Sequence, residues 1–126
     1  MYFDVNDPKP IYEQIVMGIK KDILLGVYVS GDKIPSVREQ AKLLGINPNT
    51  ISKAYKELEN QDVIVTIRGK GTFVKETLNR ERSIKNEEKL RKQLNEWVIE
   101  AHYANVSSQM IEKWMKEELR RTYDDY

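Results

Sequence analysis

The sequence predicts a mainly α protein with a small β-hairpin, in which an N-terminal winged helix-turn-helix is followed by a two-helix C-terminal dimerisation segment. Two observations predict the first part: two helix starts lie close together between Ser36 and Glu59, and a glycine-containing hairpin pattern follows at residues 63–74. Two amphipathic stretches in the last third of the chain predict the second part. We therefore expect a DNA-binding type of domain at residues 1–76 and a helical segment at residues 77–126.

The first of the two helix starts opens a short helix whose ends are both marked. Ser36 is followed three residues later by Glu39, the capping-box arrangement in which each side chain accepts a hydrogen bond from a backbone N–H. Gly45 can take a positive φ angle, so it suits the end of this helix and a tight turn. Asn47 followed by Pro48 marks a second helix start, because Asn caps well and Pro suits the first helical turn.

The second of these helices has two chemically different faces. Its apolar stripe, which we expect in the core, consists of Ile51, Ala54, Tyr55 and Leu58. Its other face consists of Asn49, Thr50, Ser52, Lys53 and Lys56. Polar and cationic groups at the N-terminal end of a helix are suited to base edges and phosphates. Together the two short helices predict a helix-turn-helix whose second member is a recognition helix.

An isoleucine-rich helix precedes the helix-turn-helix. Isoleucine recurs at every fourth position from Ile11 to Ile23, which predicts a helix with one face toward the core. We expect this helix to begin after Pro10, where a first-turn proline belongs, and to stop at Gly26 after Leu25.

A β-hairpin is predicted directly after the recognition helix. The β-branched run at residues 63–67 is answered by residues 72–74 across a glycine-containing turn. Arg68 and Lys70 would stand at the tip of this wing, where glycines let the backbone approach a phosphate or enter the minor groove. Residues 26–35, with two glycines and a proline, predict a loop or a short strand leading into the helix-turn-helix.

The last third of the chain predicts two amphipathic helices. A long helix from about Arg80 to Glu100 is expected to be solvated early and packed late, and residues 105–108 break it. Ser107 or Ser108 then caps a last helix. The apolar residues of both faces, which we predict at a dimer interface, are Leu94, Trp97, Val98, Ala101, Met110, Ile111, Trp114, Met115 and Leu119. A second copy of the pair would cover these faces in a four-helix arrangement.

Composition excludes several classes of function. The chain has 126 residues, 40% of them apolar and 33% charged, and it has no cysteine, so disulfide scaffolds and thiolate metal sites are excluded. No leader-like N-terminus and no long apolar run is present, which predicts a cytoplasmic protein without a membrane partner. The net charge of +1 carries no prediction by itself. The cations beside the proposed binding elements are Lys33, Arg38, Lys53, Lys56, Arg68 and Lys70.

The helix-turn-helix and the wing carry a family resemblance. The run P-S-V-R-E-Q-A-K-L-L-G-I-N-P-N-T-I-S-K-A-Y-K-E-L-E, followed by G-K-G-T-F-V at residues 69–74, closely resembles the winged-helix domain of GntR-family bacterial transcription regulators. The N-P-N-T start of the recognition helix and the short chain look most like the YtrA-type subfamily. The resemblance covers residues 8–75 in detail. It implies a homodimeric repressor that binds an inverted-repeat operator in double-stranded DNA. Regulators of this kind often control their own operon together with ABC-transporter genes, and a small-molecule effector, where there is one, loosens DNA binding by shifting the dimer geometry.

The resemblance also implies site residues. The arginine of this motif is a base or phosphate contact in GntR-type proteins, a role that falls on Arg38. We assign base-edge readout to Asn49 and Ser52, and phosphate contacts to Thr50 and Lys53; the family often has arginine at position 48 or 49, so its base preference does not carry over. The full predicted DNA-binding set is Ser36, Arg38, Asn47, Asn49, Thr50, Ser52, Lys53, Arg68, Gly69, Lys70 and Gly71.

Alternative functions have less support in the residues. His102 is the only histidine, so neither a histidine-rich metal site nor a Ser-His-Asp centre is available, and we expect no metal, no cofactor and no enzymatic activity. Trp97 and Trp114 would line an effector pocket if one exists, although tryptophans on helix stripes more often belong to a core or interface. A winged helix that binds protein partners without specific DNA binding is the alternative reading of the fold.

Overall fold

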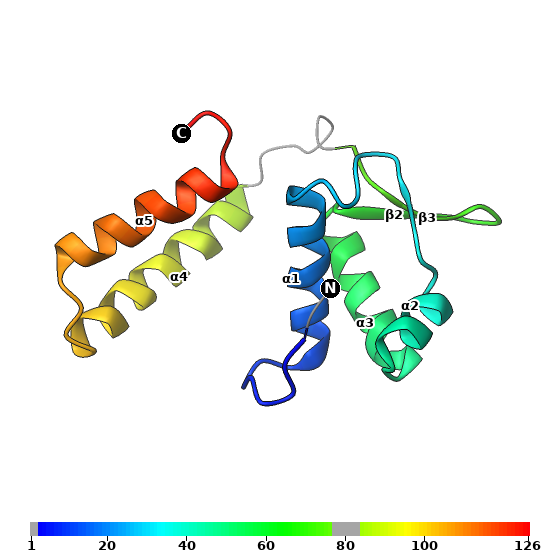
Figure 1. The fold of residues 1–126 in the computed structure, drawn as a ribbon, viewed down its shortest axis with the longest axis horizontal. Coiled ribbons are helices and arrows are strands. Elements are labelled where there is room, and N and C mark those ends of the chain that lie inside the picture. Colours follow the sequence, from blue (N-terminus) through cyan, green and yellow to red (C-terminus); the bar gives the residue numbers. More distant parts are fainter. Residues whose placement is uncertain (1–2, 77–83) are drawn as a thin grey trace. The chain divides into compact units, whose positions relative to one another are not determined.

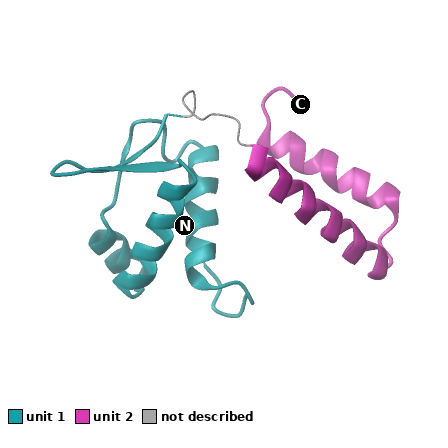
Figure 2. Ribbon diagram, turned by 180° about the vertical axis from the view of Figure 1, so that it is seen from behind, with its two compact units in different colours: residues 1–80 teal, residues 81–126 magenta. Residues whose placement is uncertain are grey.

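The computed structural model describes residues 3–76 and 84–126. The chain divides into two compact units, residues 1–80 and residues 81–126 (Figure 2). The boundary expected after residue 76 borders residues 77–83, which lie outside the described part. Each unit is described by itself. The first unit is the predicted winged helix-turn-helix (Figure 1). Its elements are α1 (Ile11–Leu24), β1 (Lys33–Ile34), α2 (Val37–Leu44), α3 (Pro48–Asn60), β2 (Ile64–Ile67) and β3 (Gly71–Val74).

Helix α1 begins after Pro10, as predicted, and ends at Leu24, one residue earlier than expected. The backbone N–H of Gly26 bonds the carbonyl of Ile23, and Gly26 takes φ +80°, a conformation that ends a helix. Leu25 is therefore the C-terminal cap of α1.

The strands form one antiparallel sheet in the order β1-β3-β2. The hairpin of β2 and β3 is the predicted wing, with Thr66 opposite Thr72 and Ile67 opposite Gly71. The segment for which a loop or a short strand was predicted supplies the two residues of β1, of which Lys33 pairs with Phe73. The wing thus has a third strand at its base, and it extends past the helices on the side where α2 lies (Figure 1).

The core lies between the apolar stripes of α1 and α3 and the inner face of the sheet. Its largest fully buried side chains are Ile15, Ile19, Ile51, Leu58, Ile64 and Val74. The stripe predicted for α3 is buried throughout, including Tyr55, which is 4% exposed. Because this stripe faces inward, the polar residues at the start of α3 face solvent.

The second unit is a helical hairpin of α4 (Ile84–Tyr103) and α5 (Ser108–Thr122). The expected start of the first helix, residues 80–83, lies outside the described part, and its end falls three residues beyond Glu100. The break between the helices occurs where Asn105 takes φ +62°. Of the two serines considered as caps, Ser107 has this role, since its hydroxyl accepts a hydrogen bond from the N–H of Met110 at 3.1 Å.

Candidate nucleic-acid interface

The start of α2 has the predicted capping box. The hydroxyl of Ser36 accepts a hydrogen bond from the N–H of Glu39 at 3.1 Å, and the Glu39 carboxylate accepts one from the N–H of Ser36 at 3.3 Å. The Ser36 hydroxyl therefore has a structural partner already, although the residue is exposed. Arg38 lies in the first turn of α2 and is also exposed. Arg38 thus lies at the N-terminal end of α2, away from the Gly45 end that leads into the turn.

The turn between α2 and α3 brings the two helix ends together. Gly45 takes φ +66° and ends α2, and the Asn47 side chain accepts a hydrogen bond from the N–H of Asn49 at 2.8 Å to begin α3. Arg38 and Pro48 line the same open hollow beside this turn. The arginine predicted to contact DNA thus lies next to the start of the recognition helix.

Helix α3 presents most of its predicted contact residues to solvent. Asn49, Ser52 and Lys53 are exposed, whereas Thr50 is half-buried. Asn49 and Lys53 are four residues apart, so they lie on the same side of the helix, with Ser52 beside them. This arrangement offers one amide, one hydroxyl and one ammonium group on a single exposed surface, the groups that base edges and phosphates bind.

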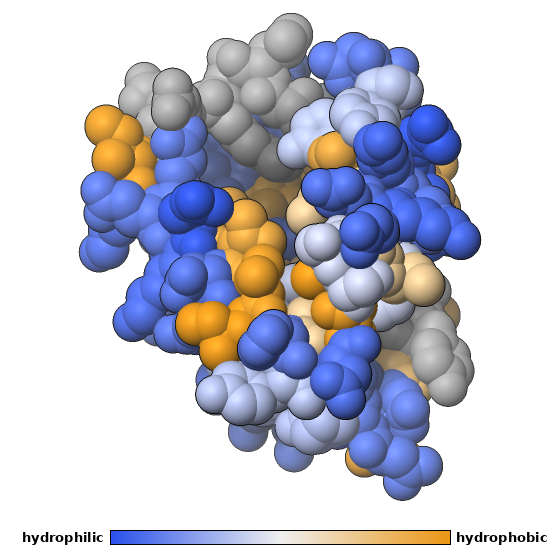
Figure 3. Space-filling view, turned by 90° about the vertical axis from the view of Figure 1, so that its left-hand side faces the viewer, coloured by the Kyte–Doolittle hydropathy of each residue, from blue (hydrophilic) through white to orange (hydrophobic). Residues whose placement is uncertain are grey.

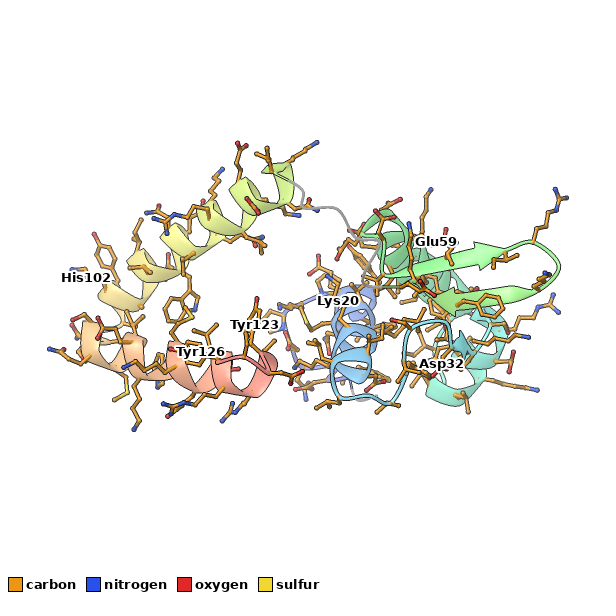
Figure 4. All side chains as sticks on the ribbon, turned by 90° about the horizontal axis from the view of Figure 1, so that it is seen from above. Lys20, Asp32, Glu59, His102, Tyr123 and Tyr126 are labelled. Atoms are coloured by element: carbon orange, nitrogen blue, oxygen red, sulfur yellow. The ribbon has the colours of Figure 1, made fainter. Side chains whose placement is uncertain are left out.

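Two side-chain hydrogen bonds join α3 to its neighbours, one from the middle of the helix and one from near its C-terminal end. The Tyr55 hydroxyl donates a hydrogen bond of 2.6 Å to the carbonyl of Pro35, just before the cap of α2. Burial raises the pKa of the Tyr55 phenol above its ordinary value, so the group is a neutral donor. Near the C-terminal end of α3, the carboxylate of Glu59 accepts a hydrogen bond of 2.6 Å from the Thr66 hydroxyl of β2. Figure 4 labels Glu59 beside the strands. These contacts hold the recognition helix in position relative to both α2 and the wing.

The wing tip is a tight turn that exposes two cations. The N–H of Lys70 bonds the carbonyl of Ile67 at 3.0 Å, and Gly69 takes φ +79°. Arg68 and Lys70 are exposed on either side of Gly69. The backbone of this tip is unhindered, because a Cβ atom added at Gly69 would meet no atom within 4 Å. Such a tip suits contact with a phosphate backbone or a groove.

Gly71, the last residue of the predicted DNA-binding set, has different surroundings. It is half-buried and takes φ +130°, and a Cβ atom there would lie 2.7 Å from Cε of Lys33. The stem of Lys33 therefore lies over this glycine, at the end of the strand pairing next to the wing tip. Gly71 makes room for a cation of β1, a contact that the sequence pattern did not predict because the pairing of β1 with β3 was not known.

A second contact was also missed by sequence reasoning. The ammonium of Lys53 lies 4.1 Å from the centroid of the Tyr12 ring, a cation–π geometry. The periodicity of α1 marked Tyr12 only as part of an apolar stripe. No local signal connects a residue at the start of α1 with one in the second turn of α3, since only tertiary packing brings them together.

The helical hairpin leaves most of its predicted interface residues accessible in the single chain. Among its described residues only Ala101 is buried, whereas Trp97 is 45% exposed and Trp114 is 39% exposed. The rings of Trp97 and Trp114 meet edge to face with their centroids 6.3 Å apart. The other predicted interface residues are half-buried or exposed: Leu94, Val98, Met110, Ile111, Met115 and Leu119. In Figure 3 apolar side chains, coloured orange, reach a surface that is otherwise mostly polar.

Other kinds of site find no support in the described residues. None of them form a group of three or more His, Asp or Glu side chains that could hold a metal ion. His102 is exposed at the end of α4, where its ring meets that of Tyr103 at 5.8 Å (Figure 4). No helix within residues 3–76 and 84–126 is long and apolar enough to cross a membrane.

A capped recognition helix with a polar outer face, an adjoining α2 and a cationic wing define the winged helix-turn-helix class of nucleic-acid-binding proteins. The family described as bacterial regulatory proteins, gntR family, matches residues 11–74, which hold all of these elements. The chain belongs to this GntR family. DNA-binding transcription regulation is the activity that this membership supports.

Relatives extend the match beyond the winged helix. The HTH-type transcriptional repressor YtrA of Bacillus subtilis (strain 168) is 43% identical over 114 residues, or 90% of this chain and 88% of that protein. A transcriptional antiterminator from Listeria monocytogenes EGD-e has a crystal structure that superposes with a TM-score of 0.90 at 42% identity, covering 94% of this chain and 88% of that one. A GntR family transcriptional regulator from Listeria monocytogenes gives a TM-score of 0.65 at 42% identity, over 91% and 98%. The match to YtrA supports the YtrA-type subfamily.

Proposed function

We propose that the protein is a homodimeric, sequence-specific repressor whose two α3 helices enter successive major grooves of an inverted-repeat operator. The observation that carries this proposal is the outer face of α3, where Asn49, Ser52 and Lys53 are exposed at the N-terminal half of a helix whose other face is core. Recognition helices contact base edges with their N-terminal residues. The geometry therefore suits base readout by Asn49 and Ser52.

Backbone contacts would position α3 in the groove. Arg38, beside the start of α3, and Lys53, one turn along it, are exposed cations on either side of the proposed base-reading residues. Arg68 and Lys70 at the wing tip would bind flanking phosphates. Thr50 is assigned to phosphate and offers its half-buried hydroxyl, whereas Ser36 and Asn47 support the interface mainly as helix caps.

The C-terminal hairpin would hold two copies together. A pair of helices with Ala101 as its one buried described residue has no core of its own, and a helical unit of this size seldom folds without a partner. A second hairpin related by a two-fold axis would cover Trp97, Trp114 and their apolar neighbours. The two rings meet edge to face, and tryptophans on helix stripes more often belong to a core or an interface than to a small-molecule pocket.

The direction of regulation and the targets rest on relatives. The name of the Bacillus subtilis relative, a transcriptional repressor, favours repression by steric block. The YtrA-type resemblance implies that the protein acts in the cytoplasm and that its targets are its own operon and ABC-transporter genes. An effector, if this protein has one, would act by changing the geometry of the helical hairpin. Thermal-shift screening of small metabolites would find ligands of the protein, and each ligand would then be tested for its effect on operator binding. The effector hypothesis is abandoned if no ligand weakens operator binding.

The test is a fluorescence-anisotropy titration against the protein's own upstream promoter fragment and a scrambled fragment, at several salt concentrations. We expect preference for the promoter and an affinity that falls steeply with salt, because phosphate contacts release counterions. Arg38→Ala should weaken promoter binding by about 1–3 kcal/mol. Lys21→Ala, which removes an exposed cation from the last turn of α1, is the matched control. Salt-independent or absent DNA binding by a folded protein would favour the protein-interaction alternative.

A further inference from the structure

We propose that Tyr12 positions the ammonium of Lys53 for its contact with the DNA backbone. The inference rests on the proposed function and deepens it, because it assigns a role in DNA binding to the first turn of α1. Tyr12 would act through Lys53 rather than by touching DNA itself. It is thus a positioning residue of the interface.

The Tyr12 ring is a fixed platform. It is half-buried and packs against the core cluster between α1 and α3, so core packing restrains its orientation. Its hydroxyl donates a hydrogen bond of 3.3 Å to the carboxylate of Glu13, which restrains the outer edge of the ring as well. The Lys53 ammonium lies 4.1 Å from the centroid, well inside the range of cation–π attraction.

The contact leaves the cation available. A carboxylate partner would neutralise Lys53, and no ion pair between Lys53 and a carboxylate is formed within the described part of the chain. A ring face attracts the ammonium while most of its N–H donors stay free for phosphate oxygens. Lysine loses much rotamer freedom when it is ordered by a ligand, and a ring that already confines the side chain reduces that loss.

The position of Lys53 on α3 makes a confined ammonium group useful for DNA binding. Lys53 lies one helical turn after Asn49 on the same side of α3, so its ammonium borders the proposed base-reading residues. Without the ring, the long side chain would sample many directions around the helix surface. The ring therefore selects, in the free protein, conformations in which the charge stays beside the reading surface.

A double-mutant cycle tests the inference, with promoter affinity measured for the full chain carrying Tyr12→Leu, Lys53→Ala and both changes. Tyr12→Leu should weaken binding about two- to fivefold in the native background, from the size of an exposed cation–π contact. It should have no further effect when Lys53 is already alanine. Lys53→Ala should reduce the salt slope by about one, whereas Tyr12→Leu should leave the slope unchanged because the charge remains.

Two variants separate positioning from other roles of the ring. Tyr12→Phe keeps the ring face and should keep the affinity; a loss would show that the hydroxyl contacts DNA and would overturn the inference. Tyr28→Leu removes another half-buried ring that packs against the same core cluster and controls for loosening of the core. If it weakens binding as much as Tyr12→Leu does, the effect belongs to the core and the inference fails.

A readout without DNA keeps this inference distinct from the proposed function. In NMR spectra of the free protein, the ε-methylene protons of Lys53 should be shifted upfield by the ring current, and the shift should disappear in Tyr12→Leu and persist in Tyr12→Phe. Equal weakening by Tyr12→Leu with and without Lys53 would overturn positioning while leaving specific DNA binding in place. Absence of promoter binding by the unchanged protein would instead refute the proposed function, and the inference with it.

Discussion

Replacing Tyr55 with phenylalanine removes one hydroxyl from the joint between α3 and the start of α2. The ring is 4% exposed and keeps its packing in the variant, so the change isolates the 2.6 Å hydrogen bond to the carbonyl of Pro35. Such a bond contributes about 1 kcal/mol net, and more when the abandoned partner stays buried. Because Pro35 is half-buried, water can replace part of the loss. We expect the free energy of unfolding at neutral pH to fall by about 1 kcal/mol.

The same hydroxyl gives the prediction a pH dependence. Burial raises the pKa of Tyr55 above its ordinary value of about 10, so the folded protein keeps the proton where the unfolded chain releases it. The stabilisation by Tyr55 is therefore complete below a pH of about 10 and declines as the pH rises further. Tyr55→Phe lacks this group, so its deficit should shrink above that pH. Burial also raises the pKa of Tyr28, which interacts electrostatically with Tyr55, so the Tyr28→Phe variant is measured over the same pH range.

Urea denaturation followed by far-UV circular dichroism, at neutral pH and above pH 10, measures both effects. The slope of the free energy against urea should be unchanged, since neither chain gains or loses buried surface. Tyr28→Phe is the matched control, because the Tyr28 hydroxyl has no hydrogen-bond partner among the described residues. Equal stability of Tyr55→Phe and the native protein at neutral pH would refute the hydrogen-bond argument. A deficit that persists undiminished at high pH would refute the ionisation argument.

Two further substitutions test the hairpin and the wing. Trp114→Ala should weaken the proposed dimer by about 2 kcal/mol or more in sedimentation at low concentration, as expected for a tryptophan in its interface, whereas Lys113→Ala, which removes an exposed cation of α5, should not. An unchanged dimer in both variants would place Trp114 outside the interface. Gly71→Ala should lower the thermal midpoint more than Gly69→Ala, because φ +130° at Gly71 lies farther from the left-handed region open to alanine than φ +79° at Gly69, whereas the exposed Lys33 side chain, 2.7 Å from the new Cβ, can move aside. The reverse order would contradict this account of the two wing glycines.

Much of the winged helix could be predicted from the sequence because its signals are local. The Ser36–Glu39 capping box, the left-handed Gly45 and the Asn47 cap each depend on residues within a few positions of one another, and the structure confirms all three. The wing was likewise marked by two β-branched runs and a glycine turn. Local hydrogen bonds of this kind depend only on residues a few positions apart, so the sequence alone predicts them.

The exact ends of elements were less predictable. Helix α1 was expected to include Leu25, and the strand that completes the sheet was left open as a loop or a short strand. The strand depends on hydrogen bonds that another element supplies, in the pairing of Lys33 with Phe73 far along the chain. Helix ends also fray, so a shift by one residue is within the spread of such boundaries.

By itself, the sequence determined the helix starts, the turn, the wing and the family of this protein, since each rests on short-range chemistry or on residue identity. Only the tertiary structure decided which side chains support the recognition helix. Tyr55 reaches Pro35, the Tyr12 ring lies under the Lys53 ammonium, and Lys33 crosses Gly71 because the packing of α1, α3 and the sheet brings distant residues together. Contacts across the core depend on how whole elements pack, and residue spacing along one element cannot specify them.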